Sequence, residues 1–213
     1  MEKNKLKPTI GILSLQGDYY LHHKILKTRN VKTIYVNSID NLHLTDGLII
    51  PGGESTVMTK LLVDTGLYQE IKIYSKSKNI FGTCAGAIMM SSKCDDTKIK
   101  QLNIIDIQVY RNAWGRQINS FTDNIKLLFD KEIEYLTTFI RAPKLKTLSN
   151  KVDIIGLYHD EPVLIRNSLH MVSSFHPEMS SSSIVHDYFI SMINKRILSN
   201  TNKSKLNKSH LLK

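Results

Sequence analysis

Cysteine and tryptophan are scarce in this chain of 213 residues, which has two cysteines, Cys84 and Cys94, and one tryptophan. Two cysteines do not make the disulfide framework of a small secreted protein, so we expect a reducing, cytoplasmic location. No window approaches the roughly 20 unbroken apolar residues of a membrane helix, and we expect no membrane association. The basic start of the chain has only a short apolar run without a small-residue cleavage site, so we expect no secretory signal.

Acidic residues are missing from positions 195–213, a stretch rich in lysine, asparagine and serine. Six of the 29 basic residues lie there, so the rest of the chain has 23 against 19 acids, and the net charge of +10 falls to +4. We expect residues 198–213 to form a flexible, solubilising tail. Nucleic acid is not an expected partner, because the tail has no interleaved aromatic residues for base stacking.

The remainder, residues 1–197, has the composition of an ordinary globular protein, and we expect it to form a single domain. Apolar runs at 9–15, 31–37, 46–53 and 79–83 predict strands, and the segments between them have helical spacing. Leu21, Ile25 and Leu26 share one face of the first helix, and Gly66 breaks a later one. This alternation predicts an α/β fold with a parallel sheet covered on both faces.

From about residue 99 the pattern becomes mostly strand-like. The expected strands lie within 102–110, 117–122, 135–143, 152–160, 162–168 and 169–178, and a last helix spans 183–198. We also expect the helix after Cys84 to run from Ala85 to Lys93. The second half should extend the sheet and return its last strand beside the first ones.

Cys84 ends an apolar run, NIFGTC, and has a glycine two residues away on each side. The spacing Gly82-x-Cys84-x-Gly86 is that of a nucleophile elbow, in which the reactive residue occupies a strained turn between a strand and a helix. Glycines relieve crowding in such a turn, and the start of the following helix favours a thiolate. We interpret Cys84 as a nucleophile; the alternative is a tight structural turn.

His176, in SFHPE, is the histidine best placed to carry protons for this thiolate. In an extended segment, residues i and i+2 project to the same side, so Glu178 can hold one imidazole nitrogen while the other faces Cys84. No Cys/His cluster has ligand spacing, so we expect no metal site, and we expect no cofactor. Surface or packing roles are expected for His22, His23, His43, His159, His170, His186 and His210.

The segment PGGEST, residues 51–56, follows an expected strand. Open α/β sheets bind ligands at the carboxyl edge of their strands, where the Cys84 turn should also lie. The backbone N–H groups of Gly52, Gly53 and Ala85 are our candidates for the oxyanion hole that acyl transfer requires. An ordinary turn ahead of a helix is the alternative interpretation.

Together, GTCAGA, PGGEST and SFHPE resemble the motifs of class I glutamine amidotransferases with a Cys-His-Glu triad. Three further segments are similar, in the same order, to the glutaminase subunits of pyridoxal 5′-phosphate synthases: LSLQGDYYLH (13–22), RNAWGRQINSF (111–121) and FIRAP (139–143). The similarity covers roughly residues 8–197. Trp114 stands where that family often has another aromatic residue.

The resemblance implies a flavodoxin-like three-layer α/β/α fold with a mostly parallel central sheet, and hydrolysis of L-glutamine to glutamate and ammonia. It implies that Cys84 is the nucleophile, His176 the general acid and base, and Glu178 the residue that orients His176. It implies that glutamine is bound by Gly53, Glu54, Ser55, Arg111, Ile140 and Arg141. Either arginine suits the glutamine carboxylate, and Glu54 suits the ammonium.

The partner implied by the resemblance is a barrel-shaped synthase subunit, which would form a hetero-oligomer with this chain and use the ammonia to build pyridoxal 5′-phosphate. Ammonia released into neutral water becomes ammonium and loses its nucleophilicity, which favours an enclosed path to a docked partner. Two alternatives remain at this point. The chain is a glutaminase or thiol hydrolase of another system, or it is a non-catalytic binding module.

Overall fold

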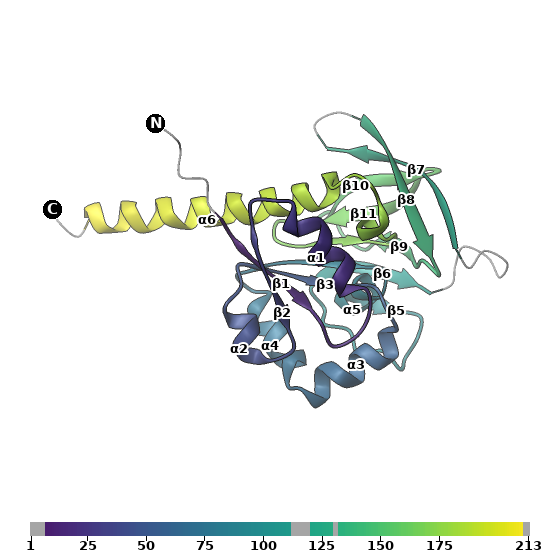
Figure 1. Cartoon of the computed structure of the whole chain (residues 1–213), viewed down its shortest axis with the longest axis horizontal. Helices are drawn as coiled ribbons and strands as arrows, with labels where there is room; N and C mark the ends of the chain where they lie inside the picture. The colour runs from purple at the N-terminus through teal and green to yellow at the C-terminus, as the bar shows by residue number, and fades with distance from the viewer. Residues whose placement is uncertain (1–6, 112–119, 130–131, 211–213) are drawn as a thin grey trace.

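A parallel half and an antiparallel half form one nine-stranded sheet in the computed structural model, which describes residues 7–111, 120–129 and 132–210. The strand order is β2-β1-β3-β4-β12-β11-β10-β7-β8 (Figure 1). Neighbours from β2 to β12 are parallel, and neighbours from β12 to β8 are antiparallel. The strands are β1 (Thr9–Leu13), β2 (Lys32–Val36), β3 (Gly47–Ile50), β4 (Asn79–Thr83), β7 (Ser120–Leu128), β8 (Glu132–Ile140), β10 (Asp153–Tyr158), β11 (Glu161–Arg166) and β12 (Met171–Ser173).

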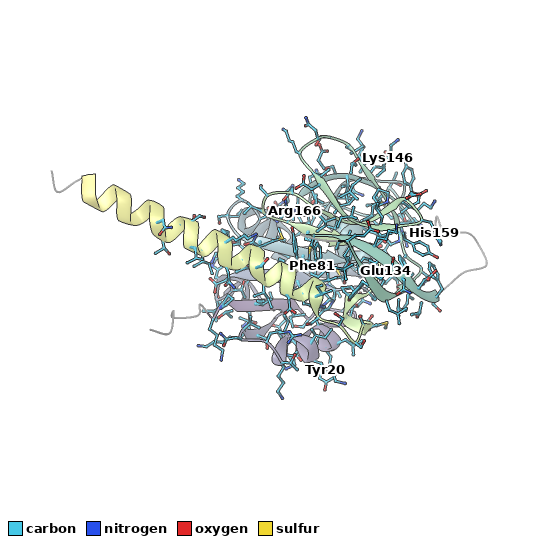
Figure 2. The ribbon with its side chains drawn as sticks, turned by 90° about the horizontal axis from the view of Figure 1, so that it is seen from above. Tyr20, Phe81, Glu134, Lys146, His159 and Arg166 are labelled. Carbon is cyan, nitrogen blue, oxygen red and sulfur yellow. The ribbon has the colours of Figure 1, made fainter. Side chains whose placement is uncertain are left out.

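Helices cover both faces of the parallel half, which gives the three layers that the sequence predicts. On one face pack α1 (Tyr19–Lys27) and α6 (Ile184–His210), through side chains such as Leu26 and Phe189. The view from above shows α6 crossing over Phe81 of β4, and the rings of Phe81 and Phe189 are 5.5 Å apart between centroids (Figure 2). The other face is covered by α2 (Ile39–His43), α3 (Ser55–Asp64), α4 (Leu67–Tyr74) and α5 (Ala85–Met90).

A separate three-stranded sheet lies against the second of these faces. It consists of β5 (Ser91–Cys94), β6 (Ile105–Tyr110) and β9 (Lys144–Thr147), in the order β5-β6-β9. Burial along β6 alternates strictly, so its inward residues Ile105, Ile107 and Val109 join the hydrophobic core while the residues between them are half-buried. This alternation is typical of a sheet with one covered face.

Most of the predicted elements are confirmed. Each of the first four predicted strands contains one of β1 to β4, and Gly66, with φ of 74°, separates α3 from α4. The last strand, β12, returns beside β4 in parallel, as expected. The α/β prediction with its parallel strands therefore holds for the part of the sheet that carries Cys84.

Several elements differ from the prediction. The short helix α2 and the strand β9 were not expected, and α5 ends at Met90 because the chain turns at Ser91 to begin β5. Strand β7 continues to Leu128, beyond the predicted end at residue 122. Its paired neighbour β8 supplies hydrogen bonds along the whole length, and this partner is not visible in the local sequence.

The last helix is the largest difference. We predicted its end at residue 198, but α6 continues to His210 and projects away from the body of the molecule (Figure 1). The helix has no glycine or proline that would stop it. Within the described ranges no helix, α6 included, is long and apolar enough to cross a membrane. The flexibility of residues 198–213 stays a prediction.

Candidate active site

Cys84 occupies the corner between β4 and α5, at the carboxyl edge of the parallel strands. Its φ of 47° is a conformation that L-residues rarely adopt. The two flanking glycines are required by close packing: a Cβ on Gly86 would lie 2.0 Å from the carbonyl oxygen of Ile50, and one on Gly82 would lie 2.6 Å from the carbonyl carbon of Gly86. The local geometry is therefore that of a nucleophile elbow.

His176 and Glu178 form the second part of the site. Nδ1 of His176 lies 2.7 Å from Oε1 of Glu178, and both side chains are buried. A carboxylate only accepts hydrogen bonds, so Nδ1 carries the proton. The predicted extended segment is wrong in detail, because Glu178 lies in the short 3₁₀ helix η1 (Pro177–Met179). The turn still brings the two side chains together.

The side chain of Cys84 lies close enough to His176 to act on its imidazole, and it is one of the groups that raise the pKa of His176. Burial acts against a charged imidazole, but the hydrogen bonds and charges of Cys84 and Glu178 outweigh it and raise the pKa of His176 to about 10. For Glu178, burial alone would raise the pKa, and its interactions with His22 and His176 lower it to about 2. The structure thus joins the three predicted triad residues as sulfur, imidazole and carboxylate.

The PGGEST loop contacts the imidazole directly. A Cβ on Gly52 would lie 2.4 Å from Cε1 of His176, so only a glycine fits between this loop and the ring. The carbonyl oxygen of Gly52 accepts a hydrogen bond from the N–H of Asp18, at 3.2 Å between nitrogen and oxygen. In a trans peptide the N–H of Gly53 points to the opposite side, away from Asp18. Gly53 itself has φ of 156°.

Glu54 and Ser55 begin α3 immediately after this loop. The backbone N–H of Glu54 donates to Oε1 of Gln16, at 3.0 Å between nitrogen and oxygen, so the loop is bonded to the LQGD segment twice. The Glu54 carboxylate is exposed and accepts from Thr56. The Ser55 hydroxyl is buried and has no hydrogen-bond partner among the described residues.

Ile140 and Ala85 flank the sulfur of Cys84. The carbonyl oxygen of Ile140, at the end of β8, lies 3.6 Å from Sγ of Cys84. Ala85 is the first residue of α5 and is buried, so its N–H belongs to the unpaired group at a helix start. Arg141 follows Ile140 with φ of 42°, and its side chain is exposed.

Arg111 is a predicted site residue that no described contact joins to Cys84, His176 or Glu178. Its guanidinium is paired with the carboxylate of Asp96, and its backbone N–H donates to Asp95. These residues line an open pocket with Thr97 beside the small sheet. The rest of the motif, including Trp114, lies outside the described residues.

His22 was missed in the sequence and lies against the triad. It is completely buried, and its Nε2 atom is 3.4 Å from Oε2 of Glu178. The predicted surface or packing role therefore does not fully describe His22, which also lies beside the carboxylate of Glu178. A signal was present in the sequence, because His22 lies one helical turn before Leu26 and shares the inward face of α1.

Ligand atoms of Asp18, His176 and Glu178 lie within 4.8 Å of one another, a grouping that could hold a metal ion. The hydrogen bond to Glu178 already occupies Nδ1 of His176 with a proton, so this nitrogen has no free lone pair for a metal.

A cysteine elbow beside a histidine–glutamate couple, at the carboxyl edge of a doubly wound sheet, is the arrangement of a class I glutamine amidotransferase. The model of the SNO glutamine amidotransferase family matches residues 12–195, and the chain belongs to this family. It is 40% identical over 181 residues to the pyridoxal 5′-phosphate synthase subunit PdxT of Oenococcus oeni, covering 85% of this chain and 94% of the relative. For PdxT of Thermosipho africanus the identity is 39% over 188 residues, covering 87% and 99%.

Solved structures agree with this assignment. A crystal structure of a glutamine amidotransferase matches with a TM-score of 0.82 and 34% identity, over 87% of this chain and 98% of that one. A putative GMP synthase subunit from Thermoplasma acidophilum matches with a TM-score of 0.64 at 13% identity, over 94% of this chain and all of the other. The second likeness concerns the fold alone.

Proposed function

We propose that this chain is the glutaminase subunit of a pyridoxal 5′-phosphate synthase. It hydrolyses L-glutamine to L-glutamate and ammonia, and a partner synthase subunit uses the ammonia to make pyridoxal 5′-phosphate. The observation that carries the proposal is the hydrogen-bonded couple of His176 and Glu178, with Cys84 acting on the same imidazole, in a chain of the glutamine amidotransferase family. The names of the relatives supply the synthase.

The reaction begins with attack of the Cys84 sulfur on the side-chain carboxamide of glutamine. The tetrahedral oxyanion is held by the N–H groups of Ala85 and of the Gly52–Gly53 loop. His176, protonated between Cys84 and Glu178, gives a proton to the leaving nitrogen as the carbon–nitrogen bond breaks. Ammonia departs, and a γ-glutamyl thioester remains on Cys84.

Water then hydrolyses the thioester. His176 accepts a proton from the attacking water, and the carbon–sulfur bond breaks to release glutamate and restore the sulfur. Glu178 stays ionised throughout, because its pKa is lowered to about 2. Its hydrogen bond fixes the ring of His176 and stabilises the imidazolium. This division of roles agrees with the raised pKa of His176 and the lowered pKa of Glu178.

Glutamine is bound by groups around this centre: Gly53, Glu54, Ser55, Arg111, Ile140 and Arg141. The buried hydroxyl of Ser55 lacks a partner among the described residues, which suits a group that waits for a ligand. Arg111 is held by Asp96 and must leave it before it can bind a carboxylate. The mobility of this arginine is therefore part of the proposal.

The partner is a barrel-shaped synthase subunit in a hetero-oligomer that encloses the ammonia. Docking also gates the glutaminase, through the LQGD segment and the Gly52–Gly53 peptide. The two hydrogen bonds that join these segments, from Asp18 to Gly52 and from Glu54 to Gln16, give a direct route from a docked surface to the oxyanion hole. Equal rates of glutamate release with and without the synthase would end the gating idea.

The decisive experiment mixes the chain with a pyridoxal 5′-phosphate synthase subunit and glutamine as the sole nitrogen source. Formation of pyridoxal 5′-phosphate is expected, and substitution of Cys84 by alanine should abolish it unless ammonium is added. Glutamine hydrolysis without transfer to this synthase would indicate a glutaminase of another system. Binding to the synthase without hydrolysis would indicate a non-catalytic module.

A further inference from the structure

Behind the triad, a row of buried polar side chains continues from Glu178 into the helical layer. Oε1 of Glu178 is bonded to His176, and Oε2, which has no hydrogen-bond partner among the described residues, lies 3.4 Å from Nε2 of His22 on α1. Nδ1 of His22 in turn lies 2.9 Å from Nε2 of His186 on α6. His22 and His186 are both completely buried. Two helices that are far apart in the chain therefore meet at the back of the triad carboxylate.

The chemistry of these atoms selects one arrangement of protons. A carboxylate only accepts, so the favourable partner for Oε2 is an N–H on Nε2 of His22. Neutral imidazole has one N–H, so Nδ1 of His22 is then an acceptor and Nε2 of His186 must donate to it. This leaves Nδ1 of His186 without a proton, and that buried atom has no hydrogen-bond partner among the described residues.

Thr83 competes for His22, because its hydroxyl lies 3.3 Å from the same Nε2 atom. If the proton were on Nδ1 of His22, this hydroxyl could donate to Nε2. The lone pair of Nε2 would then face Oε2 of Glu178, and two acceptors would be buried side by side at 3.4 Å. The opposite tautomer avoids this contact, since its N–H is directed at the Thr83 oxygen and places a positive hydrogen, not a lone pair, beside Oε2.

The row is neutral beyond Glu178. Burial lowers the pKa of His22, which Glu178 and Asp18 raise and His176 lowers further. Burial also lowers the pKa of His186, to about 3, and the groups acting on it are His22, Glu178 and Arg29. Arg29 is itself paired with Asp187, at 2.9 Å between Nε and Oδ1. At neutral pH both histidines therefore act as hydrogen-bonding groups without charge.

We propose that His22 is a positioning residue of the glutaminase, whose Nε2–H lies beside the unpartnered Oε2 of Glu178 and stabilises its charge, and that His186 fixes the tautomer that makes this possible. The inference rests on the proposed function, because it concerns the same triad. The N–H dipole beside Oε2 favours the ionised carboxylate, and with it the hydrogen bond that Oε1 accepts from His176. A neutral donor achieves this without placing a second cation beside the imidazolium.

The first test reads the tautomers directly, on the unsubstituted chain without a partner. In ¹⁵N-labelled protein at pH 7, the ring nitrogens of His22 and His186 should both show the Nε2–H tautomer. A cationic His22, or an Nδ1–H tautomer at either residue, overturns the proposal. This measurement needs no activity, so it stays informative if the proposed glutaminase function fails.

The second test is kinetic and uses the chain together with its synthase. The His22→Leu variant loses the donor, and we expect kcat to fall about 10- to 100-fold at an unchanged KM, as is usual when an outer partner of a functional side chain is removed. The His22→Gln variant keeps an amide N–H near the Nε2 position and should recover most of kcat. The same order is expected for His186→Leu and His186→Gln.

The control is His170→Leu, which removes another buried histidine, one whose Nδ1 atom also lacks a partner among the described residues. This variant should lose stability and keep kcat, because His170 does not contact the triad in any described interaction. Equal kcat values for wild type and His22→Leu, or equal losses for His22→Leu and His22→Gln, overturn the positioning role. If the leucine variants do not fold, the ¹⁵N measurement decides.

Discussion

The triad and the arginine sites differ in how completely the structure assembles them. Cys84, His176 and Glu178 are buried near the ends of β4, β8 and β12, and His176 is hydrogen-bonded to Glu178 and influenced by Cys84. Arg111, beside the small sheet, is instead occupied by Asp96. The proposed reacting groups are thus assembled in this structure, whereas the proposed recognition group Arg111 is paired with Asp96.

This difference follows from the two parts of the fold. Parallel strands with helices on both faces hold the ends of their strands at fixed positions, and loops at this edge are short. The small sheet packs by one face only, and Arg111 lies at the end of its middle strand. In the proposed site, the reacting residues therefore lie on the parallel half of the sheet, and one proposed glutamine-binding residue, Arg111, lies beside the less constrained small sheet.

The largest effect is expected at the nucleophile. Substitution Cys84→Ala should lower glutamate release in the presence of synthase by more than about 10⁴-fold, because the covalent intermediate cannot form. Cys94→Ala is the matched control and should leave the rate unchanged, since Cys94 contacts Asp95 and no triad residue among its described interactions. Retention of a tenth of the activity by the Cys84 variant would remove the basis of the proposed mechanism.

Glu178→Gln should lower kcat by about 10³- to 10⁴-fold, because the ring of His176 loses both its orientation and the charge that stabilises the imidazolium. The pKa of His176, now about 10, should fall in this variant, since Glu178 is one of the groups that raise it. An NMR titration of His176 measures this shift. Glu161→Gln, which removes a carboxylate paired with Lys144 on the surface, is the control and should change neither quantity.

Acid should destabilise the protein through its buried neutral histidines. Burial lowers the pKa of His170 to about 4 from an ordinary value of 6.5. Between these values the unfolded chain binds the proton and the folded chain does not, so stability is complete above pH 6.5 and falls by about 3 kcal/mol as the pH falls to 4. Urea unfolding across this range should show a shallower pH dependence for His170→Leu than for wild type.

Gly52→Ala tests the contact between the PGGEST loop and the imidazole. The added Cβ would lie 2.4 Å from Cε1 of His176, so either the ring or the loop must move, and we expect kcat to fall about 10- to 100-fold. Gly66→Ala is the control, because its Cβ meets only Ile39 at 3.6 Å. It should lose about 1 kcal/mol of stability at its positive φ and keep its activity. Similar kcat values for the two variants would contradict the contact.

The smallest effect concerns Arg111. If this arginine must leave Asp96 to bind glutamine, Asp96→Asn should lower KM about two- to threefold, which is the scale of a partly exposed ion pair. Arg111→Ala should raise KM, and adding Asp96→Asn to it should then have no further effect. A change of KM by Asp96→Asn in the absence of Arg111 would show that the carboxylate acts through another group.

Features that depend on a few neighbouring residues could be predicted from the sequence. The glycines around Cys84 predict the elbow, and the spacing of His176 and Glu178 predicts that their side chains meet. Even here the local conformation was wrong, since Glu178 lies in a 3₁₀ turn. The predicted contact of the two side chains is nevertheless correct, because either conformation brings positions i and i+2 close enough for a hydrogen bond.

Features that join distant segments could not be predicted from the residues alone. His22 appears as a polar residue on an apolar helical face, and only the fold reveals that it faces Glu178 from the other end of the chain. The pairing of Arg111 with Asp96 depends in the same way on how β5 and β6 align. Strand β9, of four residues, is defined by its pairing with β6 and has too little local pattern to be recognised.

The backbone at position 84 has a consequence for how the protein can change. A φ of 47° suits glycine, and any other residue there costs about 1–3 kcal/mol. A chain selected only for resistance to unfolding would therefore lose its thiol at this position. At this one residue, stability against unfolding and catalytic activity make opposite demands. A more heat-resistant descendant must gain its stability through substitutions at other positions.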